Sequence, residues 1–136
     1  MIHENILYPQ ECYQIQDAVI DVHKEMGGGF LEAVYQECLE RELSLRQIPF
    51  ESKKHLEILY KGKPLASRYA PDLVCYGKII VEIKAAKVIT PEHKAQLINY
   101  LKATSIELGL LINFGAHLRA EIVRMANTNF KCFNRE

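Results

Sequence analysis

The sequence predicts a mixed α/β (α+β) fold in which a central β-sheet of mixed strand direction is flanked by helices. Two amphipathic helical patterns open the chain, and three strand patterns separated by turn residues follow them. A further helical pattern then precedes one or two apolar strands. Helices on both sides of a strand-rich segment are typical of layered architectures. The expected order of elements is α-α-β-β-β-α-β-β.

The N-terminal third predicts two antiparallel helices. Apolar residues recur at steps of three and four over residues 12–26, and Pro9 lies near the start of this first helix. The glycines at 27–29 end it, and a second helix begins near Phe30 and ends before Pro49. The glycine triplet superficially resembles a phosphate-binding loop, but it follows a helix instead of a strand. We therefore interpret it as an interhelical turn.

The middle of the chain predicts antiparallel strands. Apolar and polar residues alternate over 51–60, and Lys61-Gly62 supplies a turn. The chain returns over 65–69, and residues 73–76 extend or follow that strand. After a turn at Tyr76-Gly77, residues 78–85 form the next strand.

The C-terminal part predicts one helix and further strands. Thr90 is the expected N-cap of a helix with Pro91 at its first position. The continuous apolar run over 107–114 is typical of a strand that is buried on both faces. Residues 120–125 predict one more strand, whereas the tail at 126–136 is polar and is not assigned to an element.

Size and charge limit the classes of protein that fit. A chain of 136 residues can form its own core, and we expect a single domain over 1–136 with a core of about 6–125. Apolar residues make up 49% and charged residues 25%, which is ordinary for a globular protein. Lys plus Arg and Asp plus Glu both number 17, so the total charge does not indicate a strongly basic nucleic-acid binder. A local basic face stays open, because electrostatic steering depends on how charge is distributed.

The cysteines and the lack of targeting patterns predict the compartment. Cys12, Cys38, Cys75 and Cys132 are widely spaced and form no CxxC pair, which argues against a zinc site and fits buried thiols in a reducing compartment. No secretory or transit segment opens the sequence, and no apolar run approaches the length of a membrane span. We therefore expect a soluble, cytoplasmic protein with no membrane partner.

The strand after the Tyr76-Gly77 turn carries two charges among apolar residues. Because successive strand side chains alternate between faces, Glu82 and Lys84 point one way. The apolar side chains of the other face are Ile79, Val81 and Ile83. Charges in such a strand need a partner, a metal ion or water.

Asp72 follows the turn before this hairpin and can supply a second carboxylate at the same place. Two carboxylates that converge with a lysine suit a cation of the magnesium type, which prefers oxygen ligands and keeps several waters. Such an ion lowers the pKa of a bound water and neutralises charge on a phosphate, while Lys84 could orient or deprotonate that water or balance the phosphate. The alternative is a surface hairpin in which Glu82 and Lys84 pair in solvent, and the flanking isoleucines count against it.

Two sequence motifs around the charged strand resemble those of a known family. Pro71-Asp72, followed after a short hairpin by Glu82-Ile83-Lys84, resembles the motif of the PD-(D/E)XK nuclease superfamily. Gln96-Leu-Ile-Asn-Tyr100, on the next helix, resembles the QxxxY element of several of its branches, and its spacing places Gln96 and Tyr100 on one helical face.

A third signature narrows the resemblance. Residues 29–35 read G-x-x-E-x-x-Y, the pattern after which the small GxxExxY protein family is named. The resemblance spans about residues 6–125 and implies a restriction-endonuclease-like core. It also implies a nuclease that depends on Mg²⁺, with Mn²⁺ as a substitute.

The resemblance also implies roles for individual residues. Asp72 and Glu82 would hold the metal, with the Ile83 carbonyl as a third oxygen, and Lys84 would be the catalytic lysine. Glu32 would complete or support the metal site. Gln96 and Tyr100 would orient the lysine, the substrate phosphate or the attacking water.

Structural alternatives exist for the helical residues. A carboxylate such as Glu32 is favoured in the first turn of a helix by the backbone dipole without any function. Tyr35 fits a core aromatic better than a catalytic group. Gln96 and Tyr100 could form a solvated helix face.

Further residues could contact a substrate backbone. Tyr69 and Tyr76 flank the hairpin, and they either stack on bases or serve as ordinary sheet residues. Positive charge near the proposed site is expected from Lys87, His93, Lys94 and Lys102.

The sequence therefore predicts a metal-dependent nuclease that hydrolyses phosphodiester bonds of DNA or RNA. The alternative is a catalytically silent module with the nuclease fold that binds nucleic acid or protein, which the neutral charge and small size favour. A homodimer is compatible with both, because a two-fold dimer would present two sites to a duplex. Phe130 and Phe133 in the tail are candidates for that contact.

Overall fold

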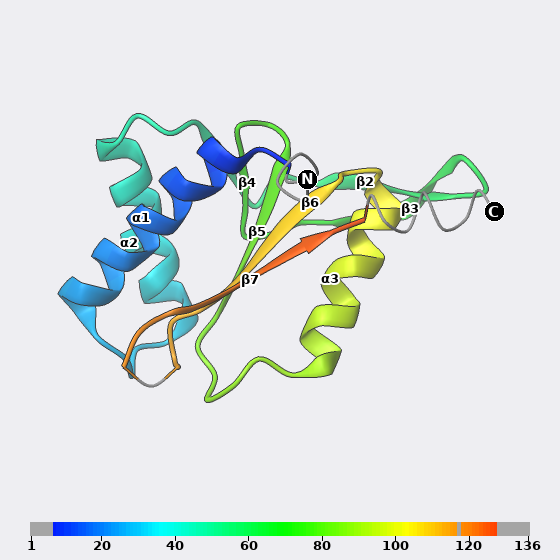
Figure 1. The fold of residues 1–136 in the computed structure, drawn as a ribbon. Coiled ribbons are helices and arrows are strands. Elements are labelled where there is room, and N and C mark those ends of the chain that lie inside the picture. The colour runs from blue at the N-terminus through cyan, green and yellow to red at the C-terminus, as the bar shows by residue number, and fades with distance from the viewer. Residues whose placement is uncertain (1–6, 117, 128–136) are drawn as a thin grey trace, which may run out of the picture.

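The computed structural model describes residues 7–116 and 118–127 and contains, within them, three helices and seven strands (Figure 1). The order is α1 (Pro9–Met26), α2 (Glu32–Leu45), β1 (Phe50–Ser52), β2 (Leu56–Tyr60), β3 (Lys63–Tyr69), β4 (Leu73–Cys75), β5 (Ile79–Lys84), α3 (Pro91–Thr104), β6 (Leu108–Asn113) and β7 (Glu121–Ala126).

The central sheet has the strand order β1-β4-β5-β6-β7. β5 and β6 are parallel, and the other neighbours in this sheet are antiparallel. The parallel pair is joined through α3, the crossover that parallel strands require. The predicted mixed sheet between helices is thereby confirmed.

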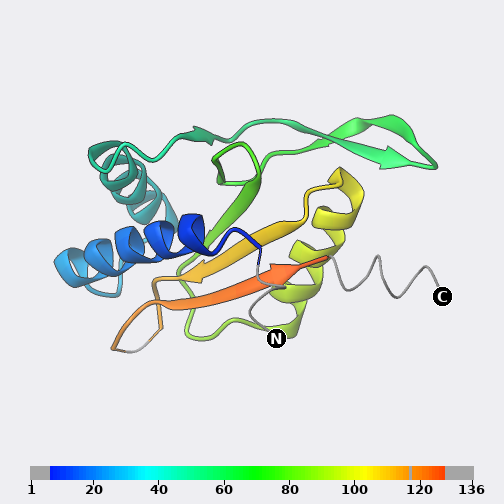
Figure 2. The same ribbon diagram turned by 45° about the horizontal axis from the view of Figure 1, so that its top comes forward.

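Helices cover both faces of this sheet (Figures 1 and 2). α1 and α2 pack over the face that carries Ile79, Val81 and Ile83, and these side chains join the larger core cluster. α3 packs over the opposite face, where Ile80 belongs to a second cluster. The predicted alternation of side chains along β5 is therefore confirmed, and β6 is buried along its whole length, as expected for a central strand.

The prediction of one strand over 51–60 is wrong. β1 pairs with β4 in the central sheet, whereas β2 pairs with β3 in a separate two-stranded sheet. The chain changes sheets at Lys53, which has a left-handed backbone (φ 56°) and donates its N–H to the Asp72 carbonyl at 3.1 Å. The corresponding break on the return path separates β3 from β4 at Ala70–Asp72, so five strands precede α3 instead of three.

The helix boundaries follow local chemistry. α1 ends at Met26: the Gly27 N–H makes the last helical bond, to the His23 carbonyl at 2.8 Å, and the positive φ of Gly27 (73°) turns the chain away from the helix. α2 begins at Glu32, two residues after the predicted start. Thr90 is the N-cap of α3 as predicted: its side chain accepts from the His93 N–H, and the His93 ring accepts from the Thr90 N–H, both at 3.1 Å.

The chain beyond β5 is fixed by a buried amide at the end of β6. The Asn113 side chain donates to the Ala86 carbonyl at 2.8 Å and accepts from the N–H groups of Ala86 and Gly115 at 2.9 and 3.0 Å. A Cβ atom at Gly115 would lie 2.5 Å from the Ala86 oxygen, so the backbones meet too closely for a side chain there. These contacts define how the chain leaves the carboxyl end of β5.

The remaining predictions concern cysteines, the tail and membranes. Cys12 and Cys75 are buried thiols as expected, and burial raises the pKa of Cys75 to about 12. Cys38 is half-buried. Cys132, Phe130 and Phe133 lie outside the described residues. No helix in the described part of the chain combines the length and apolar character that a membrane crossing demands.

Candidate active site

Asp72 lies where the pairing between β4 and β5 stops. The last paired residues are Leu73 and Val81, so Asp72 is opposite Glu82 one position beyond the ladder. The Ile83 N–H points to this side and donates to Asp72 Oδ2 at 2.7 Å in place of a strand partner. Since the N–H and C=O of one strand residue face the same edge, the Ile83 carbonyl also faces Asp72.

Glu82 is a half-buried carboxylate that accepts a hydrogen bond from the Tyr69 hydroxyl. The pKa of Glu82 is raised to about 7, chiefly by burial and in addition by the Asp72 carboxylate, while the hydrogen bond from the Tyr69 hydroxyl and the charge of the Lys84 ammonium lower it. Burial and the charge of Glu82 raise the pKa of Tyr69, so its phenol stays protonated and donates. The two carboxyl groups are therefore close enough to repel one another.

An aromatic stack joins α3 to this acid pair. The rings of Tyr69 and Tyr100 are parallel within 6° with their centroids 3.9 Å apart. Tyr69 is only 7% exposed, so its ring is a buried sheet residue and cannot stack on bases. Tyr100 thereby contacts the residue that bonds Glu82. Tyr76, the other tyrosine at the hairpin, donates its hydroxyl to Gln14 on α1.

Glu82 lines a small cavity of about 220 Å³ between β5 and α3, whereas Asp72 is not part of its lining. The sheet contributes Glu82 and Lys84, and the helix contributes Gln96 and Tyr100 on one face, as their spacing predicts. The complete lining consists of Tyr69, Glu82, Lys84, His93, Gln96, Leu97, Tyr100 and Leu111. A cavity with carboxylate, ammonium, amide and imidazole groups suits a polar substrate atom such as a phosphate oxygen.

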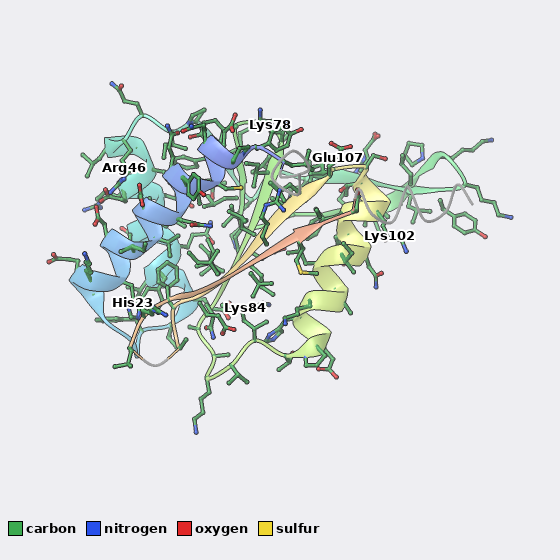
Figure 3. All side chains as sticks on the ribbon, viewed as in Figure 1. His23, Arg46, Lys78, Lys84, Lys102 and Glu107 are labelled. Carbon is green, nitrogen blue, oxygen red and sulfur yellow. The ribbon has the colours of Figure 1, made fainter. Side chains whose placement is uncertain are left out.

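Lys84 is the last residue of β5 (Figure 3). Its neighbour in the sheet is Asn113, and its own carbonyl accepts from the Phe114 N–H at 2.9 Å, so its backbone is held on the β6 side. Its ammonium acts electrostatically on Glu82, which lies on the same face of the strand.

Lys53 is a cation at the site that the sequence did not predict. Its ammonium is 2.9 Å from Asp72 Oδ1, and this hydrogen bond raises the pKa of Lys53, with smaller contributions from the charges of Glu82 and Glu32. Three carboxylates thus act on one lysine that arrives from the sheet-switching turn. The signal in the sequence is the polar run at 52–55, which interrupts the alternation of the predicted strand.

The G-x-x-E-x-x-Y segment orients the start of α2. The Tyr35 hydroxyl donates to the Gly27 carbonyl at 2.5 Å and accepts from the Phe30 N–H at 3.2 Å. Its fully buried ring stacks on the Phe114 ring, with the ring centroids 4.5 Å apart. Tyr35 is therefore a core aromatic, in agreement with the structural interpretation of this residue. This residue fastens the glycine turn and thereby fixes where Glu32 begins the helix.

Glu32 itself is exposed in the first turn of α2 and is not part of the cavity. Four residues later on the same helical face, Gln36 donates to the Asp72 carbonyl at 2.8 Å and to Glu40 at 2.9 Å. Gln36 was not predicted; its position one turn after Glu32 is the signal that could have indicated it. The face of α2 that carries both residues is therefore tied to the Asp72 turn.

The predicted positive patch is only partly at the site. His93 lines the cavity, and its Nδ1 is engaged in capping α3. Lys87 and Lys94 are exposed on either side of the start of α3. Lys102 is in the last turn of the helix, at the end away from Lys84 in Figure 3.

A larger cavity of about 1020 Å³ lies between α1 and the β6–β7 connection. Its lining includes the glycine turn, His23, Lys24 and Arg119, and no carboxylate among the described residues. Size alone would favour this cavity, but the chemistry of the smaller one, with its convergent titratable groups, makes the smaller one the candidate active site.

The donor set at the acid pair fits a hard divalent cation. Asp72 and Glu82 present carboxylate oxygens on one edge, and a cation between them would relieve the repulsion that contributes to the raised pKa of Glu82. Within the described ranges, no cluster of three or more His, Cys, Asp or Glu side chains is arranged to hold a metal. Two carboxylates are sufficient for Mg²⁺, which keeps several of its waters.

Comparisons with known proteins agree with this architecture. The solved crystal structure of SSO0001 is similar with a TM-score of 0.54 and 24% sequence identity, over 69% of this chain and 48% of that chain. That likeness shows the fold, and this chain spans about half of the other's length. No match to a curated protein was found. The profile of the PD-(D/E)XK nuclease superfamily matches residues 9–125, from the start of α1 into β7. The chain therefore belongs to the PD-(D/E)XK nuclease superfamily.

Proposed function

We propose that this protein is a divalent-metal-dependent nuclease of the GxxExxY branch and that residues 1–136 act as one domain. The observation that carries the activity is the meeting of Asp72, Glu82 and Lys84 at the edge where β4 ends. Such a convergence of charges on a central strand costs folding free energy, and features with such a cost are expected at functional sites. The superfamily indicates a nucleic acid as the substrate.

The residues of the site divide the work of phosphodiester hydrolysis. Asp72, Glu82 and the Ile83 carbonyl would hold Mg²⁺ or Mn²⁺. When bound, the ion would supply charge neutralisation at the phosphate and acidify a water. Lys84 would place its ammonium against the charge that develops on the phosphate oxygens. Gln96, which can both donate and accept, would orient the attacking water or the phosphate.

Glu32 would support the metal site from α2. Its charge acts on Lys53, the lysine that bonds Asp72, and Gln36 on the same helical face bonds the Asp72 carbonyl. Glu32 would therefore act on the acid pair through neighbours or through a bridging water. The G-x-x-E-x-x-Y pattern has a physical reason in this proposal, because Tyr35 fastens the turn that places Glu32.

A cleavage assay tests the proposal directly. Purified protein is incubated with single- and double-stranded DNA and RNA, each with Mg²⁺, with Mn²⁺ and with EDTA. We expect cleavage that requires the metal and that falls at least about 10²-fold in Lys84→Met, because an ammonium that stabilises developing charge is lost. Lys24→Met, on the exposed face of α1, is the matched control and should cleave as the wild type does. Metal-independent cleavage, or equal rates in wild type and Lys84→Met, would contradict the proposal.

One feature favours the alternative of a catalytically silent module. Asp72 is bonded to the Lys53 ammonium and Glu82 to the Tyr69 hydroxyl, so each carboxylate has a partner without a metal. If these contacts are the resting state of a silent site, Mn²⁺ will not bind measurably even at millimolar concentration. Under the nuclease proposal, Asp72 would exchange its bond to the Lys53 ammonium for a bond to the ion.

Tyr69→Phe should weaken metal binding while leaving the fold intact. The hydroxyl orients Glu82 and lowers its pKa, so its loss should reduce Mn²⁺ affinity about 10-fold at pH 7, as loss of a hydrogen bond to a ligand typically does. The deficit should narrow as pH rises, because Glu82 then ionises without help. Calorimetric titration at pH 7 and pH 8.5 checks this, with Tyr13→Phe on α1 as the control. An unchanged affinity at pH 7 would show that the hydroxyl does not position Glu82.

A further inference from the structure

We infer that residues 53–69, the β2–β3 hairpin together with the segment that leads into it from the central sheet, form an arm that binds the phosphate backbone of a polynucleotide and presents it to the candidate active site. Figures 1 and 2 show this two-stranded sheet extending from the body of the molecule, past the end of α3. The inference rests on the proposed function for the identity of the partner. Its support comes from the charge, the tip geometry and the anchoring of the arm.

Charge is concentrated in this arm. Residues 53–68 carry five basic side chains and one acidic side chain, a net charge of +4 in a chain whose total is zero. The other residues of the chain therefore sum to −4, so the arm is a cationic projection on a protein that is otherwise acidic. The five cations, Lys53, Lys54, Lys61, Lys63 and Arg68, are all exposed. Such a distribution is the electrostatic footprint of a backbone-binding element.

The tip of the arm has a defined geometry. Lys61 and Gly62 both have positive φ (51° and 80°), as a tight two-residue hairpin turn requires, and Tyr60 pairs with Lys63 across it. Lys61 and Lys63 therefore project from a fixed turn, and the Tyr60 ring beside them is 62% exposed. The Lys61 ammonium is 5.5 Å from the centroid of this ring. An exposed aromatic beside a lysine can contact a base or sugar while the lysines contact phosphates.

The arm is anchored and aimed at the site. Leu56 and Ile58 on one face of β2 pack against the cluster under α3, which gives an otherwise marginal hairpin its support. The residue at each end of the arm donates a hydrogen bond to one carboxylate of the acid pair: Lys53 to Asp72, and Tyr69 to Glu82. A polynucleotide bound along the arm is thereby led to the carboxylates.

The shape suits a polynucleotide. A two-stranded β-ribbon fits the major groove of B-DNA, and the seven residues of β3 extend about 23 Å at 3.3 Å per residue, enough to cross it. A single strand could lie along the same cations. The phosphodiester backbone is common to both kinds of polynucleotide, and binding to duplex and single-stranded probes of equal length distinguishes them.

Binding is measured in EDTA, where no metal-dependent cleavage occurs, by fluorescence anisotropy with duplex DNA, single-stranded DNA and duplex RNA of equal length. The double variant Lys61→Glu/Lys63→Glu should bind at least 10-fold more weakly at 50 mM salt than the wild type. The slope of log affinity against log salt should fall by about 2, close to one per lost phosphate contact. Lys61→Gln/Lys63→Gln should show the same loss of slope with a smaller loss of affinity.

The control is Lys24→Glu/Arg41→Glu, which makes the same change in net charge on the exposed surface of α1 and α2. It should bind within about 3-fold of the wild type, because only non-specific charge is altered. Equal affinity of the arm variant and this control, or no binding of any polynucleotide by the wild type, would overturn the inference. Arm-dependent binding without cleavage in Mg²⁺ would support the arm while contradicting the proposed nuclease activity.

Discussion

Glu82→Gln is expected to abolish metal-dependent cleavage and, in the absence of metal, to stabilise the protein above pH 7. The loss of a carboxylate ligand should reduce cleavage by at least about 10³-fold. Stability should rise because the pKa of Glu82 is raised from 4.5 to about 7, chiefly by burial, so the folded state holds the charged form at a cost. Gln keeps an oxygen that can accept from Tyr69.

The sign of the pH dependence follows from this pKa. The folded state binds the Glu82 proton more tightly than the unfolded state does, so wild-type stability should fall as pH rises from about 4.5 to 7 and then level off. The advantage of Glu82→Gln should be about 2–3 kcal/mol at pH 8 and should vanish near pH 4.5. Urea unfolding in EDTA across this range measures it, with the exposed Glu121→Gln as control. A variant less stable than wild type at pH 8 would contradict the assigned burial cost.

Asn113→Ala is expected to lower the free energy of unfolding by about 3 kcal/mol or more. The substitution removes a fully buried amide and leaves the N–H and C=O of Ala86 and the N–H of Gly115, both half-buried residues, without their partner, and each unsatisfied group costs about 1–3 kcal/mol. Because Ala86 follows the strand that carries Lys84, cleavage should fall as well.

Asn99→Ala provides the matched comparison for that variant, since Asn99 is exposed on α3. It should change stability by no more than about 0.5 kcal/mol. Chemical denaturation of both variants distinguishes the two sites. A loss of less than about 1 kcal/mol in Asn113→Ala would show that water replaces the amide, and that the segment after β5 is not held by Asn113.

The fold could be predicted where local pattern and burial agree. The apolar run of β6, the alternation along β5 and the Thr90 cap each depend on neighbours in sequence, and each is present in the structure. The division of 51–60 could not be predicted, because it depends on β1 pairing with the distant β4. Strand preferences depend strongly on such context. The left-handed backbone at Lys53, a residue type with no preference for it, also gives no local signal.

The candidate site was predictable to the extent that its residues lie on one strand or one helical turn. Glu82 and Lys84 share a face of β5, and Gln96 and Tyr100 share a face of α3, so their spacing sufficed. Lys53 and Gln36 reach Asp72 from elements far away in sequence, and no periodicity links them to it. The sequence predicts Tyr69 as a base-stacking or sheet residue, whereas its bond to Glu82 depends on where β3 ends.

The central claim is that Asp72 and Glu82 together form a cation site. The most direct test is calorimetric titration of Mn²⁺ into the full chain at pH 8, comparing wild type, Asp72→Asn, Glu82→Gln and Lys84→Met. The account predicts one ion bound by the wild type and by Lys84→Met, and at least 10-fold weaker binding by each of the two carboxylate variants. Equal binding by all four proteins, or none by the wild type, would contradict it.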